Sequence, residues 1–328
     1  MQGFAGLSLH GFRGNMAATQ QPRIAVLLPC YNEEAAIAAT VEGFRQALPG
    51  ATIYVYDNNS RDRTREVAAA AGAVVRTETQ QGKGCVVRRM FADVEADVYL
   101  MADGDLTYDP SSAREMVRQV VADQLDMVVG TRKHDAAEAY RGGHVLGNRL
   151  FTGILAGLFG RSFTDIFSGY RAFSRRFVKS FPVLSQGFEI ETEMSVHALE
   201  LRMPVGEIET RYLARPEGSH SKLSTFRDGW RILKAILTLY RTERPVLFFG
   251  GIAALLLAVA VVLAVPLVFT YLETGLVPRF PTAILVTGMT IVAVLSFFAG
   301  LILDTVTRGR REMRRLAYLA LPAPGQQL

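Results

Sequence analysis

Short apolar runs alternate with segments of helical periodicity over residues 23–132. Continuous apolar runs of this length are typical of strands that are buried on both faces of a parallel sheet. We expect such strands at 24–28, 52–56, 73–75, 98–102 and 127–129. The segments between them predict helices at 33–48, 61–71, 84–94 and 110–121. Strands that alternate with helices predict an α/β fold with an open, mostly parallel sheet.

Polar residues gather where the predicted strands end. The four clusters are Tyr31-Asn32-Glu33, Asp57-Asn58-Asn59-Ser60, Asp103-Gly104-Asp105 and Thr131-Arg132. Ligands of open α/β sheets bind beyond the carboxyl ends of the strands. We therefore expect a binding site at this edge of the sheet, within a domain that spans residues 22–222.

The segment Asp103-Gly104-Asp105 offers two carboxylates one residue apart. Mg²⁺ and Mn²⁺ prefer oxygen ligands and leave coordination positions open for phosphate oxygens. A plain turn after a strand is the alternative reading of Asp-Gly-Asp. The polar clusters around it favour a metal site on Asp103 and Asp105 that holds a nucleotide diphosphate.

Two neighbouring segments support a nucleotide ligand. Gly82-Lys83-Gly84 opens a predicted helix, where free amides and an ammonium group favour phosphate. Asn58, Asn59 and Ser60 offer hydrogen-bond donors and acceptors to a base or a ribose.

The C-terminal third contains two long uncharged stretches. No charged residue lies between Arg244 and Glu273, or between Arg279 and Asp304. Each stretch exceeds the ~20 apolar residues that span a hydrocarbon core. A buried core helix is the alternative, but such helices rarely run so long without a charge. We expect transmembrane helices at 245–272 and 280–304, joined as a hairpin.

Basic residues flank this hairpin on both sides. They are Arg241, Arg244, Arg308, Arg310, Arg311, Arg314 and Arg315. The positive-inside rule places both flanks in the cytoplasm, and with them the large domain and a basic tail at 305–328 of an inner-membrane protein. The net charge of +5 largely reflects these flanks, which suit anionic headgroups. We expect no nucleic-acid partner, because neither zinc-ligand spacing nor an aromatic-basic stripe occurs.

Three other segments complete the plan of the chain. Residues 140–222 are irregular and rich in Arg, Gly and Ser. Residues 223–244 have the period of a basic amphipathic helix, expected in the membrane interface or packed on the domain. Residues 1–21 lack the apolar core of a signal peptide and are interpreted as a tail. Cys30 and Cys85 are expected to be reduced and buried.

Four motifs occur in a fixed order. They are Pro29-x-Tyr31-Asn32-Glu33, Asp57-x-x-Ser60-x-Asp62-x-Thr64, Gly82-Lys83-Gly84 and Asp103-x-Asp105. In this order the chain resembles family 2 glycosyltransferases with the GT-A fold, and most of all their polyprenyl-phosphate branch, which includes the dolichol-phosphate mannose and glucose synthases. The resemblance covers residues 23 to about 222, and the two-span tail is similar to bacterial members. Asn58 stands where the family usually has a second Asp.

The resemblance implies roles for individual residues. It assigns the nucleotide sugar to Pro29, Tyr31, Asn32, Glu33, Asp57, Asn59, Lys83, Asp103 and Gly104, and the metal to Asp103 and Asp105. Arg132, Arg141, Arg215, Ser221 and Lys222 match segments near the acceptor phosphate and the pyrophosphate. The catalytic residues are then Asp105, Arg132, Glu189 and Lys222, with Glu189 near the sugar. The alternative for Arg141 is a solvated surface charge. The alternative for Glu189 and Glu191 is a pair that caps a helix.

We expect one inverting displacement that moves a single sugar from a UDP- or GDP-sugar to a polyprenyl phosphate. The acceptor phosphate has a second pKa near 6, so its oxygen is a nucleophile at neutral pH without a general base. One rival is a processive polysaccharide synthase, which usually has more spans and a Gln-x-x-Arg-Trp motif. A non-catalytic membrane scaffold is another, and a soluble sugar nucleotidyltransferase is disfavoured because its Gly-rich first loop is missing. The two transmembrane helices either only anchor the chain or also pack against those of other copies of the chain, through the small residues Gly250, Gly251 and Gly300.

Overall fold

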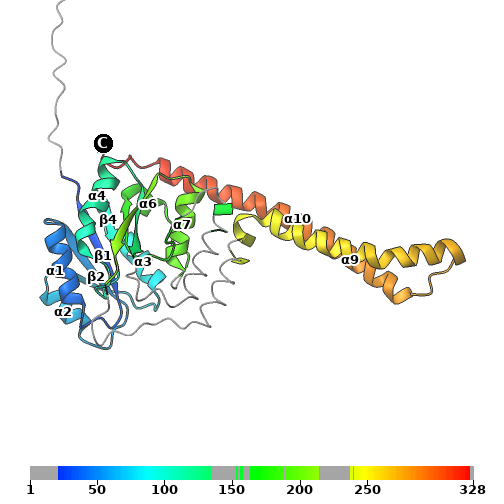
Figure 1. The fold of residues 1–328 in the computed structure, drawn as a ribbon, viewed down its shortest axis with the longest axis horizontal. Coiled ribbons are helices and arrows are strands. Elements are labelled where there is room, and N and C mark those ends of the chain that lie inside the picture. The colour runs from blue at the N-terminus through cyan, green and yellow to red at the C-terminus, as the bar shows by residue number, and fades with distance from the viewer. Residues whose placement is uncertain are drawn as a thin grey trace, which may run out of the picture.

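The computed structural model describes residues 21–133, 163–213 except 186 and 188, and 240–325, with isolated positions at 153, 156–157 and 237–238. Seven strands in these residues form one sheet in the order β3-β2-β1-β4-β6-β5-β7. Strands β1 (Ile24–Cys30), β2 (Thr52–Asp57), β3 (Val74–Thr77) and β4 (Val98–Met101) are parallel. Strand β5 (Met127–Lys133) is parallel to β7 (Val205–Arg211), and β6 (Arg171–Ser174) runs against β4 and β5. The predicted mostly parallel α/β sheet is confirmed (Figure 1).

Helices cover both faces of the sheet. One layer contains α1 (Ile37–Ala47), α2 (Thr64–Ala70) and α4 (Ala113–Ala122). The other contains α3 (Lys83–Asp93), α6 (Arg175–Ser180) and α7 (Ile190–Glu200). Alternate residues of β1 enter the two layers, Val26 and Leu28 the first, Ala25 and Leu27 the second. Burial on both faces explains why this strand is a continuous apolar run.

The register of the parallel strands brings the polar clusters to one edge. Cys30 at the end of β1 lies opposite Asp57 at the end of β2, and Leu27 lies opposite Met101 at the end of β4. Residues that follow these strands therefore emerge side by side. The predicted helix at 110–121 begins as a 3-10 turn, Pro110–Ser112, and continues as α4.

Regular structure also occurs where the sequence predicted none. The described part of 140–222 contains β6, α6, α7 and β7. Strand β6 has only four residues and begins with a fully buried arginine, Arg171, so it lacks a strand-like apolar run. Helix α7 is buried on nearly all sides, including Glu191, Ser195 and His197, so it has no single apolar stripe.

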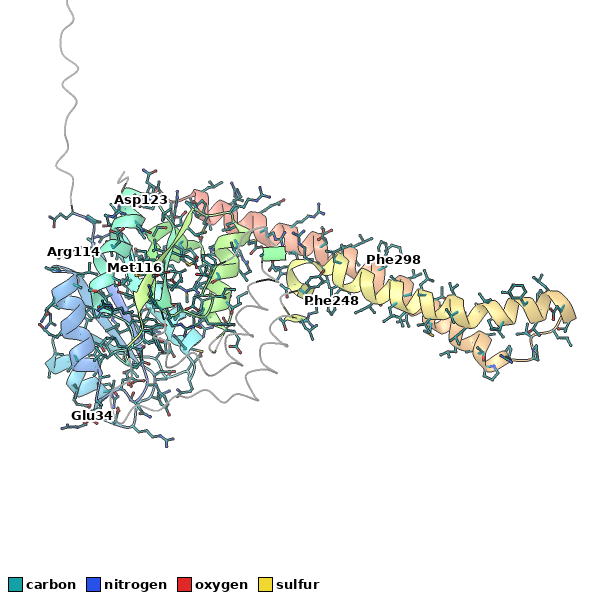
Figure 2. All side chains as sticks on the ribbon, viewed as in Figure 1. Glu34, Arg114, Met116, Asp123, Phe248 and Phe298 are labelled. Atoms are coloured by element: carbon teal, nitrogen blue, oxygen red, sulfur yellow. The ribbon has the colours of Figure 1, made fainter. Side chains whose placement is uncertain are left out.

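Two long helices extend from the domain as a hairpin. Helix α9 spans Pro245–Thr274 and α10 spans Phe280–Leu319 (Figure 1). Their most apolar windows have mean hydropathies of 3.0 and 2.3, and only 11% of each window is buried, unlike a core helix. Figure 2 shows side chains projecting outward along both helices, Phe248 and Phe298 among them. Both helices are long and apolar enough to span a membrane.

The basic C-terminal segment is part of α10 and not a separate tail. The helix continues past residue 304 without a break, and its last turns lie along the α/β domain beside α6 and α7 (Figure 1). The hydroxyl of Tyr318 donates to Asp126 (2.8 Å), and the guanidinium of Arg176 lies over the Tyr318 ring (4.7 Å). Three of the arginines predicted to face lipid headgroups also bind the domain: Arg311 and Arg314 donate to Glu200, and Arg315 donates to the carbonyl of Leu201.

Candidate active site

The acidic pair follows β4 directly. Asp103 is partly exposed, whereas Asp105 is buried, and its Oδ1 accepts hydrogen bonds from the Thr107 hydroxyl (2.6 Å) and amide (3.3 Å). A Cβ at Gly104 would overlap the Sγ of Cys30 in β1. Only glycine therefore lets this turn lie so close to β1, and the pair is held tightly at the edge of the sheet.

Lys83 places a fixed positive charge against the acidic pair. Its Nζ lies 2.5 Å from Asp103 Oδ1 and 2.6 Å from Glu191 Oε1, and its side chain is 10% exposed. Burial opposes the charged form, but the charges of Asp103 and Glu191 outweigh it and raise the pKa of Lys83. A Cβ at Gly169 would lie 3.1 Å from both Nζ and Asp103 Oδ2. Glycine there leaves space beside the pair.

The acidic residue that contacts this cluster is Glu191, two positions after the predicted Glu189. Glu191 lies in the first turn of α7 and is buried against Lys83. Glu189 is the residue before α7, and its side chain makes no capping hydrogen bond. Its role near the sugar stays a prediction. The rotation of α7 about its axis decides which of the two carboxylates faces Lys83. The sequence pattern does not show that rotation.

The first two motifs form one structural unit. Three consecutive amides after β1, those of Asn32, Glu33 and Glu34, donate to side chains of the loop after β2. The acceptors are the hydroxyls of Ser60 (2.8 Å) and Thr64 (2.9 Å) and the carboxylate of Asp62 (3.1 Å). The polar residues of these two motifs therefore hold the segment after β1 against the segment after β2.

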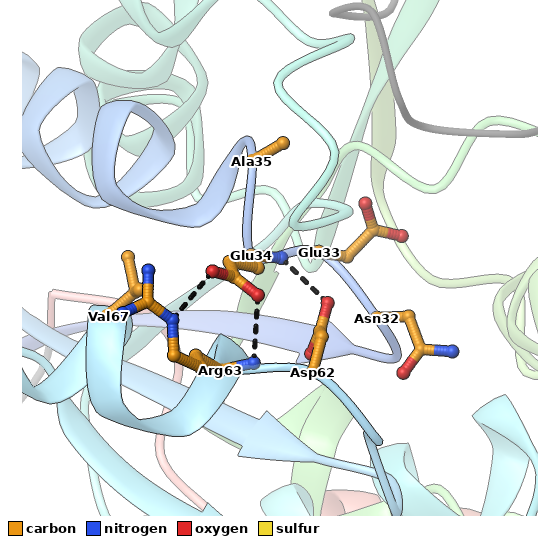
Figure 3. Close-up of a pocket in the computed structure, with 7 residues that line it drawn as sticks. All are labelled: Asn32, Glu33, Glu34, Ala35, Asp62, Arg63 and Val67. Carbon is orange, nitrogen blue, oxygen red and sulfur yellow. Dashed lines mark hydrogen bonds and ion pairs between the residues drawn. The ribbon is translucent and has the colours of Figure 1, made fainter.

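An open cavity of about 420 Å³ lies beside this unit (Figure 3). It is lined by Asn32, Glu33, Glu34, Ala35, Asp62, Arg63 and Val67. Arg63 holds one wall, because its amide (3.0 Å) and Nε (2.8 Å) donate to the Glu34 carboxylate. Glu33 and Asn32, predicted to contact the nucleotide sugar, thus border a preformed hollow.

Asp57 ends β2 as a fully buried carboxylate. Its Oδ2 accepts from the Ser60 amide (3.2 Å) and lies 3.9 Å from Arg65 Nε. Its Oδ1 has no hydrogen-bond partner among the residues that the structure describes. A buried carboxylate oxygen without a donor is costly, so this atom is suited to a donor group of a ligand.

Asn58 holds the loop that leads into α3. Its side-chain amide donates to the carbonyls of Glu78 (2.9 Å) and Gln80 (2.8 Å), and its Oδ1 accepts from the Gly82 amide (2.8 Å). An aspartate here has no N–H for the two carbonyls. The asparagine therefore helps to position Lys83 at the start of α3.

We predict that Asn58→Asp lowers the free energy of unfolding by about 2 kcal/mol or more, because a buried carboxylate would face two carbonyl oxygens. Asn59→Asp is the matched control, because the Asn59 amide also donates to a carbonyl, that of Thr79 (2.9 Å), but Asn59 is exposed. Water can therefore replace the lost hydrogen bond, and the change should cost about 0.5 kcal/mol. Chemical denaturation of the full chain in detergent measures both. Equal stability of the two variants would contradict the role given to Asn58.

Arg132 at the end of β5 is already paired within the protein. Its Nε and Nη2 donate to Asp165 (2.7 and 2.9 Å), and its guanidinium lies over the Tyr212 ring (5.6 Å). Burial opposes ionisation of both partners, but their hydrogen bonds and charges raise the pKa of Arg132 and lower that of Asp165. A role toward the acceptor stays a prediction. No sequence motif pointed to Asp165.

A buried arginine supports the floor of the site. Arg171 donates to the carbonyls of Ser168 (2.9 Å) and Ile166 (2.6 Å) and to the hydroxyl of Ser195 in α7 (2.9 Å). Burial lowers the pKa of Arg171 to about 10, so it stays charged at neutral pH. It joins β6, the loop before it and α7 beneath Lys83.

Several predicted residues and segments lie outside the described residues. They are Arg141, Arg215, Ser221 and Lys222, and residues 223–236 of the predicted amphipathic helix. Pro29 and Tyr31 are described, at the end of β1 and directly after it.

The donor chemistry of the site suits a divalent cation. Asp103 and Asp105 supply hard oxygen ligands, and the Asp103 carboxylate is shared with the Lys83 ammonium through Oδ1. Within the described residues no cluster of three or more His, Cys, Asp or Glu forms a complete metal cage. Two carboxylates with open positions are the arrangement that Mg²⁺ uses when phosphate oxygens supply further ligands.

Comparison with known proteins agrees with this geometry. The family "Glycosyl transferase family 2" matches residues 25–181. The chain is 32% identical over 299 residues to "Glycosyltransferase AglJ" of Haloferax volcanii, covering 90% of this chain and 98% of that protein. It is 27% identical over 221 residues to "Dolichyl-phosphate hexose transferase" of the same organism, covering 67% and 95%.

The fold is also found in a solved structure. Glucosyl-3-phosphoglycerate synthase of Mycobacterium tuberculosis, crystallised with Mn²⁺, UDP and its product, aligns with a TM-score of 0.56 at 21% identity, over 67% of this chain and 79% of that one. At this identity the similarity speaks for the fold alone. The strand-end motifs, the sheet and the near full-length relative agree: the chain belongs to glycosyl transferase family 2.

Proposed function

We propose that this glycosyltransferase transfers one sugar from a UDP- or GDP-sugar to a polyprenyl monophosphate, with inversion, at the cytoplasmic face of the cell membrane. One observation carries the proposal: the acidic pair at the end of β4 belongs to a domain on which a membrane-competent helix, α10, is docked. A water-soluble acceptor gives no reason for such an attachment. The relative named for dolichyl phosphate supports the same acceptor class.

On the donor side, the described residues would hold the nucleotide. Asp57 Oδ1, which has no hydrogen-bond partner within the described part of the chain, would accept from the base or the ribose. The cavity beside Asn32 and Glu33 would border the nucleotide. Asp103 and Asp105 would hold Mg²⁺ or Mn²⁺, which supplies charge stabilisation to the leaving diphosphate. The M. tuberculosis neighbour was crystallised with Mn²⁺ and UDP, which supports the use of a divalent cation.

On the acceptor side, the lipid phosphate must approach the diphosphate of the donor, and both are anions. Like charges ~4 Å apart repel by several kcal/mol at an effective dielectric of 20. Lys83, fixed beside Asp103, reduces the negative charge that an approaching phosphate meets. Arg132, with Arg141, Arg215, Ser221 and Lys222, would bind the acceptor phosphate. An oxygen of the acceptor phosphate attacks the anomeric carbon of the sugar from the side opposite the leaving diphosphate. The configuration at that carbon therefore inverts.

The experiment is transfer by the full-length protein in detergent or nanodiscs. It is incubated with undecaprenyl phosphate, Mn²⁺ and a panel of radiolabelled UDP- and GDP-sugars. The expected product is a chloroform-soluble, mild-acid-labile lipid that carries a single sugar, formed from one sugar nucleotide. Anomeric analysis is expected to show inversion.

Two results would contradict the proposal. Polymeric product would indicate a processive synthase. Turnover with none of the sugar nucleotides, together with no nucleotide binding by calorimetry, would favour a non-catalytic scaffold.

A further inference from the structure

Helix α7 has one end in the candidate active site and the other against α10. Its first turn carries Glu191, whose Oε1 lies 2.6 Å from Lys83 Nζ. Its last residue is Glu200, whose carboxylate accepts from Arg311 (2.9 Å) and Arg314 (2.6 Å) of α10. Eleven residues of α-helix span about 15 Å. A single rigid element therefore connects the helix that leaves the membrane with the acidic pair.

The contact at the far end of α7 is strong and buried. Glu200 and Glu243 have side chains that are 3% and 7% exposed, and Arg311 pairs with both. Arg315 also donates to the carbonyl of Leu201 (3.2 Å). Burial and the nearby charge of Glu243 raise the pKa of Glu200, and the arginines oppose that rise. Without the arginines, two carboxylates would be buried side by side, so this end of α7 would have to shift.

The near end of α7 depends on its contacts for position. The side chain of Glu189, the residue before the first turn, makes no capping hydrogen bond. Ser195, in the middle of the helix, is held by the buried Arg171, and Glu193 accepts from the amides of Leu184 and Ser185 (both 2.8 Å). Because the helix is packed on nearly all sides, we expect a shift at Glu200 to be transmitted along the helix to its first turn.

We propose that Arg311 and Arg314 are positioning residues of the active site. By clamping Glu200, they hold α7 where Glu191 meets Lys83, and Lys83 in turn meets Asp103. The inference rests on the proposed function only in assigning Lys83 and Asp103 to the donor diphosphate. It means that the donor site is complete only while the end of α10 is docked on the domain.

The most informative change is Arg314→Ala, which removes one of the two arginines that hold Glu200. Arg314→Lys retains a cation within reach of that carboxylate. Arg308→Ala is the matched control, because Arg308 lies on the same helix, is 76% exposed, and pairs with Asp304 of α10 itself. Glu200→Gln is the second test, since it keeps the shape of the clamp and weakens both arginine contacts.

Two measurements on the full chain in nanodiscs test the proposal. The first is amide hydrogen exchange of peptides that cover residues 189–195, which reports the opening of the first turn of α7. The second is the calorimetric affinity for UDP and for GDP, each with Mn²⁺. We expect Arg314→Ala and Glu200→Gln to speed exchange at 189–195 and to weaken nucleotide binding, each roughly tenfold. Arg314→Lys and Arg308→Ala should stay within about twofold of wild type.

The proposal is overturned if exchange becomes faster only near residue 200 and in the docked end of α10, while the first turn and the nucleotide affinity stay unchanged. The clamp would then be structural only. If Arg314→Ala unfolds the whole domain, exchange rises in every peptide. The exchange and nucleotide affinity of Glu200→Gln then decide whether the two ends of α7 are coupled. If the wild-type chain binds neither nucleotide, the proposed function fails, whereas exchange at 189–195 still decides the coupling.

Discussion

Replacing Asp105 with Asn is expected to slow sugar transfer at least about 100-fold at saturating Mn²⁺. A bound metal supplies several kcal/mol of charge stabilisation to the leaving diphosphate, and each 1.36 kcal/mol is a factor of ten in rate. Asparagine keeps an oxygen that can accept from Thr107, so the turn after β4 should be retained. The lost rate would therefore report the lost carboxylate charge.

The measurement is the initial rate of lipid-linked sugar formation, alongside Mn²⁺ binding by calorimetry in the presence of donor. Asp109→Asn is the control, because Asp109 lies outside the acidic pair and accepts from the Ser111 amide at the start of the 3-10 turn. That variant should keep nearly all activity. Chelation of divalent cations should reproduce the effect of Asp105→Asn in the wild-type enzyme. Transfer by Asp105→Asn near the wild-type rate would refute the metal role.

Replacing Lys83 with Met is expected to lower the free energy of unfolding by about 3–5 kcal/mol. Removal of one partner from a buried ion pair leaves an uncompensated charge, and here both Asp103 and Glu191 lose their shared cation. The variant should also lose donor binding, because the loss of the ammonium raises the negative charge of the site.

Chemical denaturation of the full chain measures this loss. Arg88→Met is the control, since Arg88 is exposed on the same helix and contacts Gln80 (3.0 Å). The double change Lys83→Met with Glu191→Gln should recover part of the stability, because one buried charge is then removed as well. Should Lys83→Met prove as stable as Arg88→Met, the cluster of Lys83, Asp103 and Glu191 does not form.

Local pattern predicted the first half of the domain well. The strands that became β1, β2, β4 and β5 are apolar runs that end in polar clusters, and parallel pairing of β1 with β2 and β4 brought three of those clusters to one edge, as expected. Helix boundaries were less accurate: α1 begins at Ile37, because the residues after β1 first form the turn that binds the loop after β2.

What the sequence left out depends on contacts between distant residues. Asp165 carries no motif, and Glu191 lies in a segment for which the resemblance assigned the role near the sugar to Glu189. Only the packing of the loop before β6 and of α7 brings these two carboxylates to Arg132 and Lys83. The C-terminal arginines fit headgroups and protein carboxylates equally well as a pattern. Their partner Glu200 lies more than one hundred positions away in the chain, so periodicity and spacing contain no sign of it.

The thiol beneath Gly104 has a practical consequence. Burial raises the pKa of Cys30 well above its ordinary value, so almost no thiolate exists at neutral pH. Alkylating reagents should reach this sulfur only when the turn that carries the two aspartates lifts away from β1. The rate of Cys30 modification, followed by mass spectrometry, would thus report how often that turn opens. Any ligand that holds the turn closed should slow the modification of the sulfur.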